Sequence, residues 1–261
     1  MELKVAVIQL NATENLDDNL ANAQRLCQEA VSEGAELIVL PEMFNYRPIS
    51  LPPKRRSEPL DGPSLAPLKQ ISKQNKVTIV AGSMGESIPT SEKSYNTTAV
   101  ISSEGDIQAV YRKLNLFDAK VNGVDIRESS AYETGESPVV TNVNGFKVGL
   151  SICFDIRFST LYNHYKKEGV DIILIPSSFT YNTGEAHWEV LCRARAIETQ
   201  SYVLAPNQIG KGTLEVETYG NSMIVDPWGC VIKQADSRQE TVLVATLSKR
   251  EIQSVRKKIP I

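Results

Sequence analysis

The sequence contains few cysteines and few histidines, which limits the chemistry that it can carry. Its 261 residues include four cysteines, scattered without a CxxC pair or the spacing of a disulfide framework. This usage favours one special thiol over a set of disulfides, and it fits a reducing cytoplasmic compartment. The two histidines, His164 and His187, form no recognisable metal-ligand spacing with Cys192. We therefore predict no metal site and no organic cofactor.

No charge of one sign predominates, and no apolar run is long. The formal net charge is −3 and the pI is near 5.6. Two short basic clusters, Lys54–Arg56 and Arg256–Lys258, are interpreted as solvated surface. The apolar run within Met1–Leu10 is too short for a signal peptide, and no stretch approaches membrane-spanning length. We expect neither a nucleic-acid partner nor a membrane.

Linkers, repeats and low-complexity tracts are also absent, so we expect one domain over residues 1–261. Apolar side chains alternate between strand-like and helix-like spacing, which predicts mixed sheets covered by helices. Ser248 is expected to cap a short last helix, with Glu251 completing a capping box. The other expected helices are 16–33, 64–75, one after 155, and 184–199, and the expected strands are 3–10, 37–40, 77–83, 95–101, 107–111, 139–142, 146–152, 170–175, 202–205, 219–225, 231–234 and 241–247.

Polar residues follow several apolar strands at the point where each strand is expected to end. Glu42, Ser177 and Asn207 each follow a proline that closes an apolar run, and Cys153 follows the strand 146–152. Proline removes a ladder donor and ends a strand. Ligands of α/β sheets bind beyond the carboxyl ends of the strands. We therefore expect these four side chains to share one pocket rim, provided that their strands lie side by side.

Cys153 is the candidate nucleophile. It ends a strand and precedes a predicted helix, where the helix dipole and unpaired N–H groups would lower the pKa of its thiol. Free cysteines are more often inert packing residues. Cys27, Cys192 and Cys230 are interpreted in that way, because two lie in helical patterns and one starts a strand.

The base that would activate this thiol is open between a histidine and a carboxylate. His187 begins a helical segment and could form a Cys–His pair. Glu42 follows an apolar strand, so its carboxylate is expected to be partly desolvated, which suits general acid–base work. Lys113 ends another strand. A lysine at such a place is usually solvated, but it could supply positive charge to a developing oxyanion.

Three segments resemble the signature blocks of the nitrilase-like carbon–nitrogen hydrolase family in order and spacing. They are Leu40–Glu42, Tyr111–Lys113 and Gly149–Phe158, and further similarity continues at 186–189, 193–198 and 226–229. The resemblance covers nearly the whole chain. It implies an α-β-β-α sandwich with two mixed sheets, usually paired with a second copy, so we expect a homodimer.

The resemblance also implies a Glu–Lys–Cys triad. Cys153 would be the nucleophile that forms a thioester, Glu42 the general base, and Lys113 the residue that stabilises the oxyanion. Glu128 matches a second family glutamate that often lies beside the thiol, although nothing in its local sequence singles it out. The backbone N–H of Phe154 is expected to be a further oxyanion donor. Neither a metal nor a cofactor is needed.

The residues after the nucleophile favour amides over nitriles as substrates. Cys153-Phe154-Asp155 is closer to the Cys-Tyr-Asp of the amidase-like branches than to the Cys-Trp-Glu typical of true nitrilases. Segments 115–118 and 183–189 resemble deaminated glutathione amidase and ω-amidase, and 193–200 is nearer the first. We therefore expect release of ammonia or an amine from a small carboxylate-bearing amide. Deaminated glutathione is the first choice and α-ketoglutaramate the second.

Several alternatives stay open. The chain could hydrolyse an N-carbamoyl amine, or pass its acyl group to an amine in place of water. It could also be a scaffold or binding protein without turnover, which the intact triad argues against. The resemblance implies that His187 is not the base. Thr183 and the segment Ser177–Phe179 are candidates for the pocket wall, with Ser177 and Phe179 named within that segment. The loop Met43–Pro53 carries no pattern that indicates a substrate.

Overall fold

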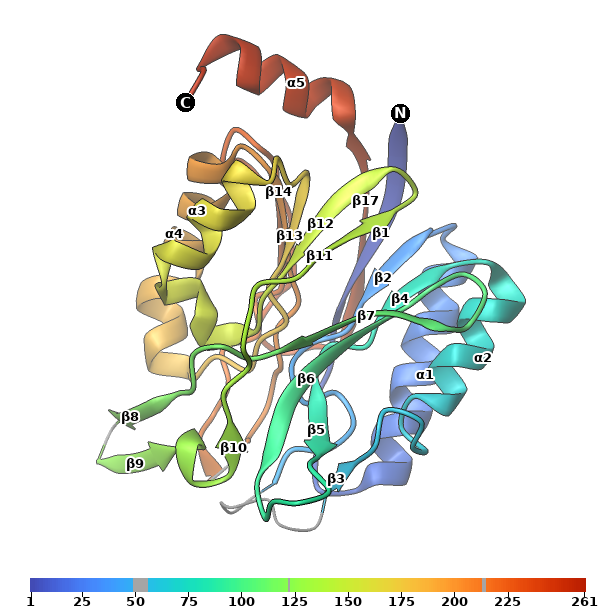
Figure 1. The fold of residues 1–261 in the computed structure, drawn as a ribbon, viewed down its shortest axis with the longest axis vertical. Helices are drawn as coiled ribbons and strands as arrows, with labels where there is room; N and C mark the ends of the chain where they lie inside the picture. Colours follow the sequence, from blue (N-terminus) through green and yellow to red (C-terminus); the bar gives the residue numbers. More distant parts are fainter. Residues whose placement is uncertain (49–55, 122, 213–214) are drawn as a thin grey trace.

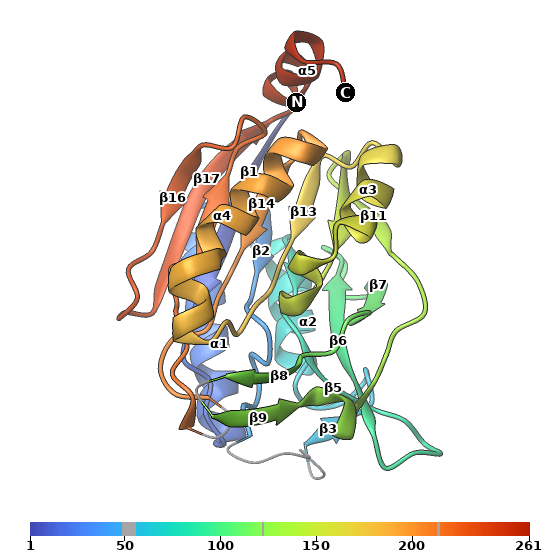
Figure 2. The ribbon, with the colours of Figure 1, turned by 90° about the vertical axis from the view of Figure 1, so that its left-hand side faces the viewer.

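The computed structural model describes residues 1–48, 56–121, 123–212 and 215–261 and arranges them in four layers. Two β-sheets pack face to face, and a pair of helices covers the outer face of each sheet (Figure 1, and Figure 2 after a 90° turn). The predicted α-β-β-α sandwich is confirmed. Residues 49–53 of the loop Met43–Pro53, and Lys54 and Arg55 of the first basic cluster, lie outside the described residues.

The first sheet joins the two ends of the chain. β1 (Glu2–Gln9) pairs in parallel with β2 (Leu37–Val39) and antiparallel with β17 (Thr241–Ser248). The expected strands 95–101 and 107–111 are present as β6 and β7, which pair in an antiparallel hairpin, and the sheet is mixed. Its other strands are β3 (Ser57–Glu58), β4 (Thr78–Val80), β5 (Met84–Ser87), β6 (Ser94–Ile101), β7 (Ile107–Arg112) and β10 (Tyr132–Glu133).

The second sheet is parallel in its middle and antiparallel at its edges. The order β11-β12-β13-β14-β15-β16 places the parallel strands β12, β13 and β14 between antiparallel neighbours. A separate hairpin, β8 (Asp118–Val121) with β9 (Val124–Arg127), lies beside the sandwich. The strands of the second sheet are β11 (Val140–Val143), β12 (Phe146–Leu150), β13 (Ile172–Leu174), β14 (Tyr202–Ala205), β15 (Met223–Val225) and β16 (Val231–Gln234).

Four helices form the outer layers. α1 (Leu16–Ser32) and α2 (Ala66–Asn75) cover the first sheet, and α3 (Ser159–Lys167) and α4 (Tyr181–Thr199) cover the second. Asn15 caps α1 by accepting a hydrogen bond from the Asp18 N–H at 3.3 Å. Apolar side chains on the inner faces bury the helices against the sheets, as the helical spacing predicts.

The last helix, α5 (Lys249–Lys258), extends beyond the sandwich (Figure 1). The helix is confirmed, but the predicted capping box is wrong. The Ser248 side chain makes no capping hydrogen bond. Glu251 instead accepts a hydrogen bond from the Tyr202 hydroxyl, which ties α5 to β14. A tertiary partner has thus replaced the local one.

The loops after strands of both sheets meet at one end of the sandwich. Glu42 follows β2 in the first sheet, whereas Cys153 and Asn207 follow β12 and β14 in the second. Gln208 bridges the two sheets, because its Nε2 donates to the Glu42 carbonyl oxygen at 2.9 Å. The expected side-by-side strands therefore hold only within each sheet, and the site forms where the two sheets face each other.

Candidate active site

A buried lysine held by two glutamates forms the centre of the site. Lys113 follows β7, and its side chain is fully buried. Its Nζ donates to Glu42 Oε1 at 2.9 Å and to the two Glu128 oxygens at 3.0 and 2.9 Å. Burial by itself lowers the pKa of Lys113, but Glu128 and Glu42 outweigh it and hold that pKa well above its ordinary value. The ammonium therefore stays charged. We call these three residues the charged cluster.

Neighbouring strands and turns hold the charged cluster in place. The Lys113 N–H donates to the Asn96 carbonyl oxygen at 2.9 Å, and Asn96 Nδ2 donates to Glu42 Oε1 at 2.9 Å. Glu128 begins a short 3₁₀ turn after β9, and its Oε2 accepts from the Phe117 N–H at 2.8 Å. Burial raises the pKa of the Glu128 carboxyl, against the attraction of Lys113.

The turn that carries Glu42 depends on a glycine. Gly82, after β4, has a φ of +43°, and a Cβ there would lie 1.9 Å from the Pro41 carbonyl oxygen. No larger residue fits without moving the segment that ends in Glu42. Met43, the next residue, also has a positive φ, +55°, and its N–H donates to Ser83 Oγ at 3.1 Å. The close approach of these two loops fixes where the carboxylate points.

Cys153 lies in an unusual backbone conformation. It follows β12 and opens a 3₁₀ turn, Cys153–Arg157, with a φ of +47°. Positive φ is uncommon for residues other than glycine and is concentrated at functional sites. The Cys153 N–H donates to the Pro176 carbonyl oxygen at 2.9 Å, which holds the turn against the end of β13.

The predicted lowering of the thiol pKa is wrong. Burial raises the pKa of Cys153 well above that of an ordinary thiol, and the Glu42 charge raises it further. Lys113 and the Ser178 N–H act in the opposite direction but do not prevail. The turn of five residues is not an α-helix, and α3 begins only at Ser159. The expected dipole is therefore missing, and the thiol is held neutral until a base acts on it.

Asp155 anchors the Cys153 turn, a role that sequence reasoning missed. Its Oδ2 accepts from the Tyr111 hydroxyl at 2.7 Å and from the Ile152 N–H at 2.9 Å. Its Oδ1 accepts from the N–H and side-chain amide of Asn115 at 2.9 and 2.8 Å. The carboxylate is completely buried. It joins the chain on either side of the lysine to the turn of the thiol. The position of this aspartate, two residues after Cys153, was the only signal in the sequence that could have indicated this role.

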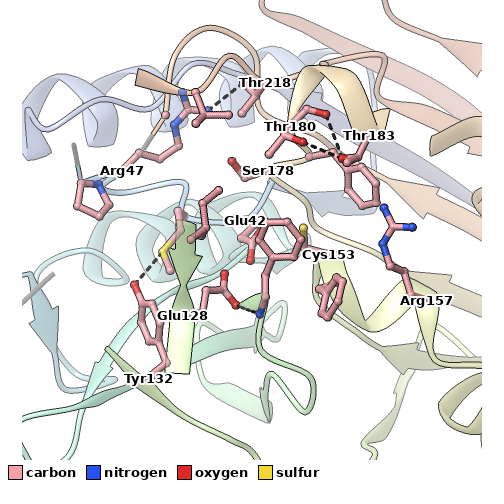
Figure 3. A pocket seen from close by; sticks show the side chains of 18 residues that line it. Glu42, Arg47, Glu128, Tyr132, Cys153, Arg157, Ser178, Thr180, Thr183 and Thr218 are labelled. Atoms are coloured by element: carbon pink, nitrogen blue, oxygen red, sulfur yellow. Dashed lines mark hydrogen bonds between the residues drawn. The ribbon is translucent and has the colours of Figure 1, made fainter. Parts of the chain in front are cut away.

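The charged cluster and the thiol border one pocket (Figure 3). The pocket opens to solvent and contains about 840 Å³ of space when its open mouth is counted. Glu42, Glu128 and Cys153 line it, whereas Lys113 lies behind them. Aromatic and aliphatic side chains form most of the remaining wall, which comprises Met43, Pro48, Phe117, Ile126, Tyr132, Phe154, Phe179 and Val216.

The predicted wall residues are only partly correct. Phe179 and Thr183 line the pocket, but Ser177 does not. Phe154, which was expected only as a backbone donor, also lines it. The Ser177 side chain is buried and donates to the Ile175 carbonyl oxygen at 3.0 Å, so it faces the protein interior. Its neighbour Ser178 faces the pocket instead. Successive side chains of an extended segment point to opposite faces, so an error of one residue exchanges the two.

The Asn207 side chain is held in hydrogen bonds to the backbone of two neighbouring segments. Its Oδ1 accepts from the Phe179 N–H at 3.0 Å, and its Nδ2 donates to the Gly220 carbonyl oxygen at 2.7 Å. Asn207 therefore supports the loop that carries Phe179 and does not line the pocket itself. The pocket rim expected from strand endings holds for Glu42 and Cys153 and is wrong for Ser177 and Asn207.

Two arginines line the pocket from different elements, and the sequence analysis named neither as a site residue. Arg157 closes the Cys153 turn, with its guanidinium carbon 5.4 Å from the centre of the Phe179 ring. Arg47 lies in the loop after β2 and is 4% exposed. In Figure 3 the two lie on opposite sides of the thiol. Arg47 belongs to the loop for which no pattern was found, so no local signal could have indicated it.

The alternative base lies outside the pocket. His187 is exposed on α4, and its Nδ1 lies 3.2 Å from Arg157 Nη2. Cys27 and Cys192 are buried in the cores beneath α1 and α4, and Cys230 is exposed. Among the described residues, no group of three or more His, Cys, Asp or Glu side chains is placed to hold a metal ion. Within the same ranges, no helix is long and apolar enough to cross a bilayer.

A thiol at a strand end, facing a pocket with a buried carboxylate, within an α-β-β-α sandwich, defines a hydrolase that works through cysteine. The sequence model of the carbon–nitrogen hydrolase family matches residues 4–257, and the chain belongs to this family. The family predicted from the three segments is confirmed. The protein is a hydrolase of the amidase type that acts on carbon–nitrogen bonds other than peptide bonds.

Named relatives match over nearly the whole chain. The omega-amidase NIT2 of Danio rerio is 36% identical over 261 residues, which covers 100% of this chain and 93% of the relative. The deaminated glutathione amidase of a Synechocystis strain is 35% identical over 261 residues, covering 98% and 95%. Among solved structures, Saccharomyces cerevisiae Nit3 has a TM-score of 0.89 and 29% identity, covering 100% of this chain and 95% of that one.

Proposed function

We propose that this chain is an amidase in which Cys153, Glu42, Lys113 and Glu128 carry out the reaction. The observation that carries the proposal is the fully buried Lys113 ammonium, held at 2.9 Å by each of two carboxylates that border the same pocket as the thiol. A buried ion pair is costly to desolvate, and such sites are a common setting for catalysis.

In the first step, Glu42 accepts the thiol proton while the Cys153 sulfur attacks the amide carbon. The S–C bond forms and the carbonyl oxygen becomes negative. The Lys113 charge, which already favours the thiolate of Cys153, and the Phe154 N–H stabilise this oxygen. Glu42 then passes its proton to the nitrogen, the C–N bond breaks, and ammonia or an amine leaves. A thioester remains on Cys153.

In the second step, water hydrolyses the thioester. Glu42 takes a proton from the water, the oxygen adds to the carbonyl carbon, and the C–S bond breaks as the proton returns to sulfur. Glu128 orients the water, since its carboxylate borders the pocket and is 16% exposed. Splitting one displacement into two lowers the barrier of each. Neither step calls for a metal or an organic cofactor.

The proposed substrate is a small amide that carries a carboxylate, such as deaminated glutathione or, as the second candidate, α-ketoglutaramate. Both candidates agree with the relatives at 35–36% identity, which are an omega-amidase and a deaminated glutathione amidase. The pocket supports an anionic substrate, because Arg47 and Arg157 line a wall that is otherwise largely apolar. N-carbamoyl amines, transfer of the acyl group to an amine, and a scaffold role without turnover remain the alternatives.

An ammonia-release assay over ω-amides, N-carbamoyl amines and nitriles tests this function. We expect turnover of carboxylate-bearing amides, and none by Cys153→Ala. Cys192→Ala is the matched control, because Cys192 is buried behind the second sheet and away from the pocket. Turnover restricted to N-carbamoyl amines or nitriles would replace the amide assignment. Lack of turnover on the whole panel by a folded protein would favour a scaffold.

We also propose that the chain acts as one domain, pairs into a homodimer and works in the cytoplasm. Val190, Ile197 and Trp228 are exposed on and beside α4, where α5 also extends from the sandwich. Exposed apolar side chains that lie together favour a protein interface. Sedimentation should give about twice the chain mass of 28.8 kDa, and Ile197→Asp should lower it. A fully active monomer would contradict the dimer. The free cysteines support a reducing compartment.

A further inference from the structure

A second buried cation lines the pocket, and no carboxylate of the described residues lies within ion-pair distance of it. The Arg47 guanidinium is nearly as buried as Lys113. Its Nη1 donates to Gln208 Oε1 at 3.3 Å, to the Ile209 carbonyl oxygen at 3.1 Å and to Thr218 Oγ1 at 3.2 Å. Its Nη2 donates to the Lys211 carbonyl oxygen and to the side-chain oxygen Oδ1 of Asn11. Each of these acceptors is neutral.

The charge of Arg47 is therefore held without being neutralised. Among the described residues, no carboxylate lies within 4.0 Å of the guanidinium, and residues 49–55, 122 and 213–214 include no Asp or Glu. The Arg47 Nε is buried and has no hydrogen-bond partner. Burial lowers the pKa of Arg47 to about 10, against the opposing effect of the more distant Glu42 charge, and Arg47 stays protonated at neutral pH. A buried charge without a partner is destabilising, so a site that keeps one is suited to an anionic ligand.

A glycine lies next to this cation on the pocket wall. Gly212 also lines the pocket, and a Cβ there would lie 3.5 Å from the Arg47 guanidinium carbon and 3.6 Å from Nε. With glycine at this position, the volume that a Cβ would fill against the guanidinium is left free. Gln208 connects this wall to catalysis, because the same amide that accepts from Arg47 donates to the Glu42 carbonyl oxygen. We call Arg47, Gln208, Gly212 and Thr218 the arginine wall.

We propose that Arg47 determines specificity by binding a carboxylate of the substrate through its unpartnered Nε–H, on the wall of the pocket that it lines. This inference rests on the proposed amidase function and specifies the substrate as an amide with a carboxylate that reaches the arginine wall. Arg47 takes no part in proton transfer. Its contribution is to ground-state and transition-state binding alike, so its loss should raise KM and leave kcat nearly unchanged.

The test compares dicarboxylic acid monoamides of increasing chain length with their neutral methyl-ketone isosteres. For the best carboxylate substrate, Arg47→Gln should raise KM by about tenfold or more, with kcat within a few-fold of wild type. The neutral isostere should be turned over equally by both proteins. Arg25 is an exposed arginine on α1, and Arg25→Gln makes the same change in net charge. This control should alter KM and kcat for neither substrate.

A second variant covers the case in which Arg47→Gln does not fold. Gly212→Ala places a methyl group in ordinary contact with the guanidinium, without a steric clash, and should raise KM for the carboxylate substrate alone. Binding of the parent dicarboxylic acid, measured by thermal shift, tests Arg47 without turnover. Equal losses on charged and neutral substrates, or unchanged dicarboxylate binding, would overturn the role of Arg47. A wild-type enzyme that binds the dicarboxylate but hydrolyses no amide would instead overturn the proposed function.

Discussion

The charged cluster and the arginine wall both bury a cation beside the same pocket, but they treat its charge differently. Lys113 is surrounded by two carboxylates at hydrogen-bond distance, so the chain itself neutralises it. Arg47 is surrounded by amide, hydroxyl and carbonyl oxygens, which accept hydrogen bonds from its N–H groups but do not neutralise its positive charge. The first arrangement is complete without a ligand. The second arrangement gains an ion-pair partner only when an anionic ligand binds.

This difference separates chemistry from recognition. Groups that are fixed before the substrate binds stabilise the transition state without reorganisation. A cation that lacks a counter-ion instead gains most from a charged ligand, because the ligand removes the cost of burying it. Changes in the charged cluster should therefore lower kcat, and changes in the arginine wall should raise KM. Each prediction below can break or sharpen this separation.

The largest effect is expected at Lys113. Lys113→Met should lower kcat by about a hundredfold or more, because an electrostatic partner of the oxyanion is worth about 3 kcal/mol. Lys113→Arg should rescue poorly, since a planar guanidinium cannot replace a compact ammonium between two carboxylates. Steady-state kinetics on the best amide measures this. Lys211→Met, at an exposed lysine, is the control. Near-normal kcat in Lys113→Met would show that the Lys113 charge is not needed for catalysis and would contradict the proposed triad.

A smaller loss is expected at Asp155. In Asp155→Asn the new amide N–H₂ group would face donors such as the Tyr111 hydroxyl and the Ile152 N–H. Unsatisfied buried donors cost about 1–3 kcal/mol, so urea unfolding should show a loss of that size. The value of kcat should fall equally on charged and neutral amides, because the turn of Cys153 loosens. Asp125→Asn, on the exposed β9, should change stability by less than about 0.5 kcal/mol. Unchanged stability of Asp155→Asn would show that the anchor is not needed.

The thiol of Cys153 should titrate late. Because burial and Glu42 raise its pKa, the thiolate fraction at neutral pH is smaller than for an ordinary thiol, whose pKa is about 8.5. The rate of iodoacetamide labelling at Cys153, followed by peptide mass spectrometry, should still rise above that pH. The same peptide in the urea-unfolded chain should show the ordinary value. A labelling rate that levels off below pH 7 would restore the helix-dipole interpretation.

The smallest effect is expected at His187. This side chain is exposed and contacts Arg157, so His187→Asn should leave kcat within a few-fold of wild type. Glu42→Gln in the same assay should lose turnover deeply, because it removes the base. A loss in folded His187→Asn that matches Glu42→Gln would revive the Cys–His pair and break the assignment of catalysis to the charged cluster.

Features that depend on neighbouring residues in the chain could be predicted from the sequence. Strand punctuation placed Glu42 and Cys153 at a pocket rim, and alternating periods gave the helices and sheets. Glu128 was indicated only by the family resemblance, and the strand-end position of Lys113 left its role open, because their partners lie in other elements. Contacts between residues that are far apart in the chain cannot be predicted from the local sequence around either residue.

Features that depend on side-chain direction or on a tertiary partner could not be predicted. Ser177 and Ser178 differ by one residue, yet only Ser178 faces the pocket. The dipole expected at Cys153 vanished because the chain makes a short 3₁₀ turn before α3 begins. Arg47 is buried by acceptors from a loop more than 160 residues away in sequence, which no pattern in its own loop could show.

The central claim is that Cys153 forms the acyl intermediate. Wild-type enzyme mixed with a slowly hydrolysed amide and quenched during turnover should show one added acyl group by intact mass. Peptide mapping should place it on Cys153, and Cys153→Ala should show none. The adduct should persist in Arg47→Gln at saturating substrate, because the arginine wall acts on binding. An acyl group on Cys27, Cys192 or Cys230, or turnover by Cys153→Ala, would contradict the account.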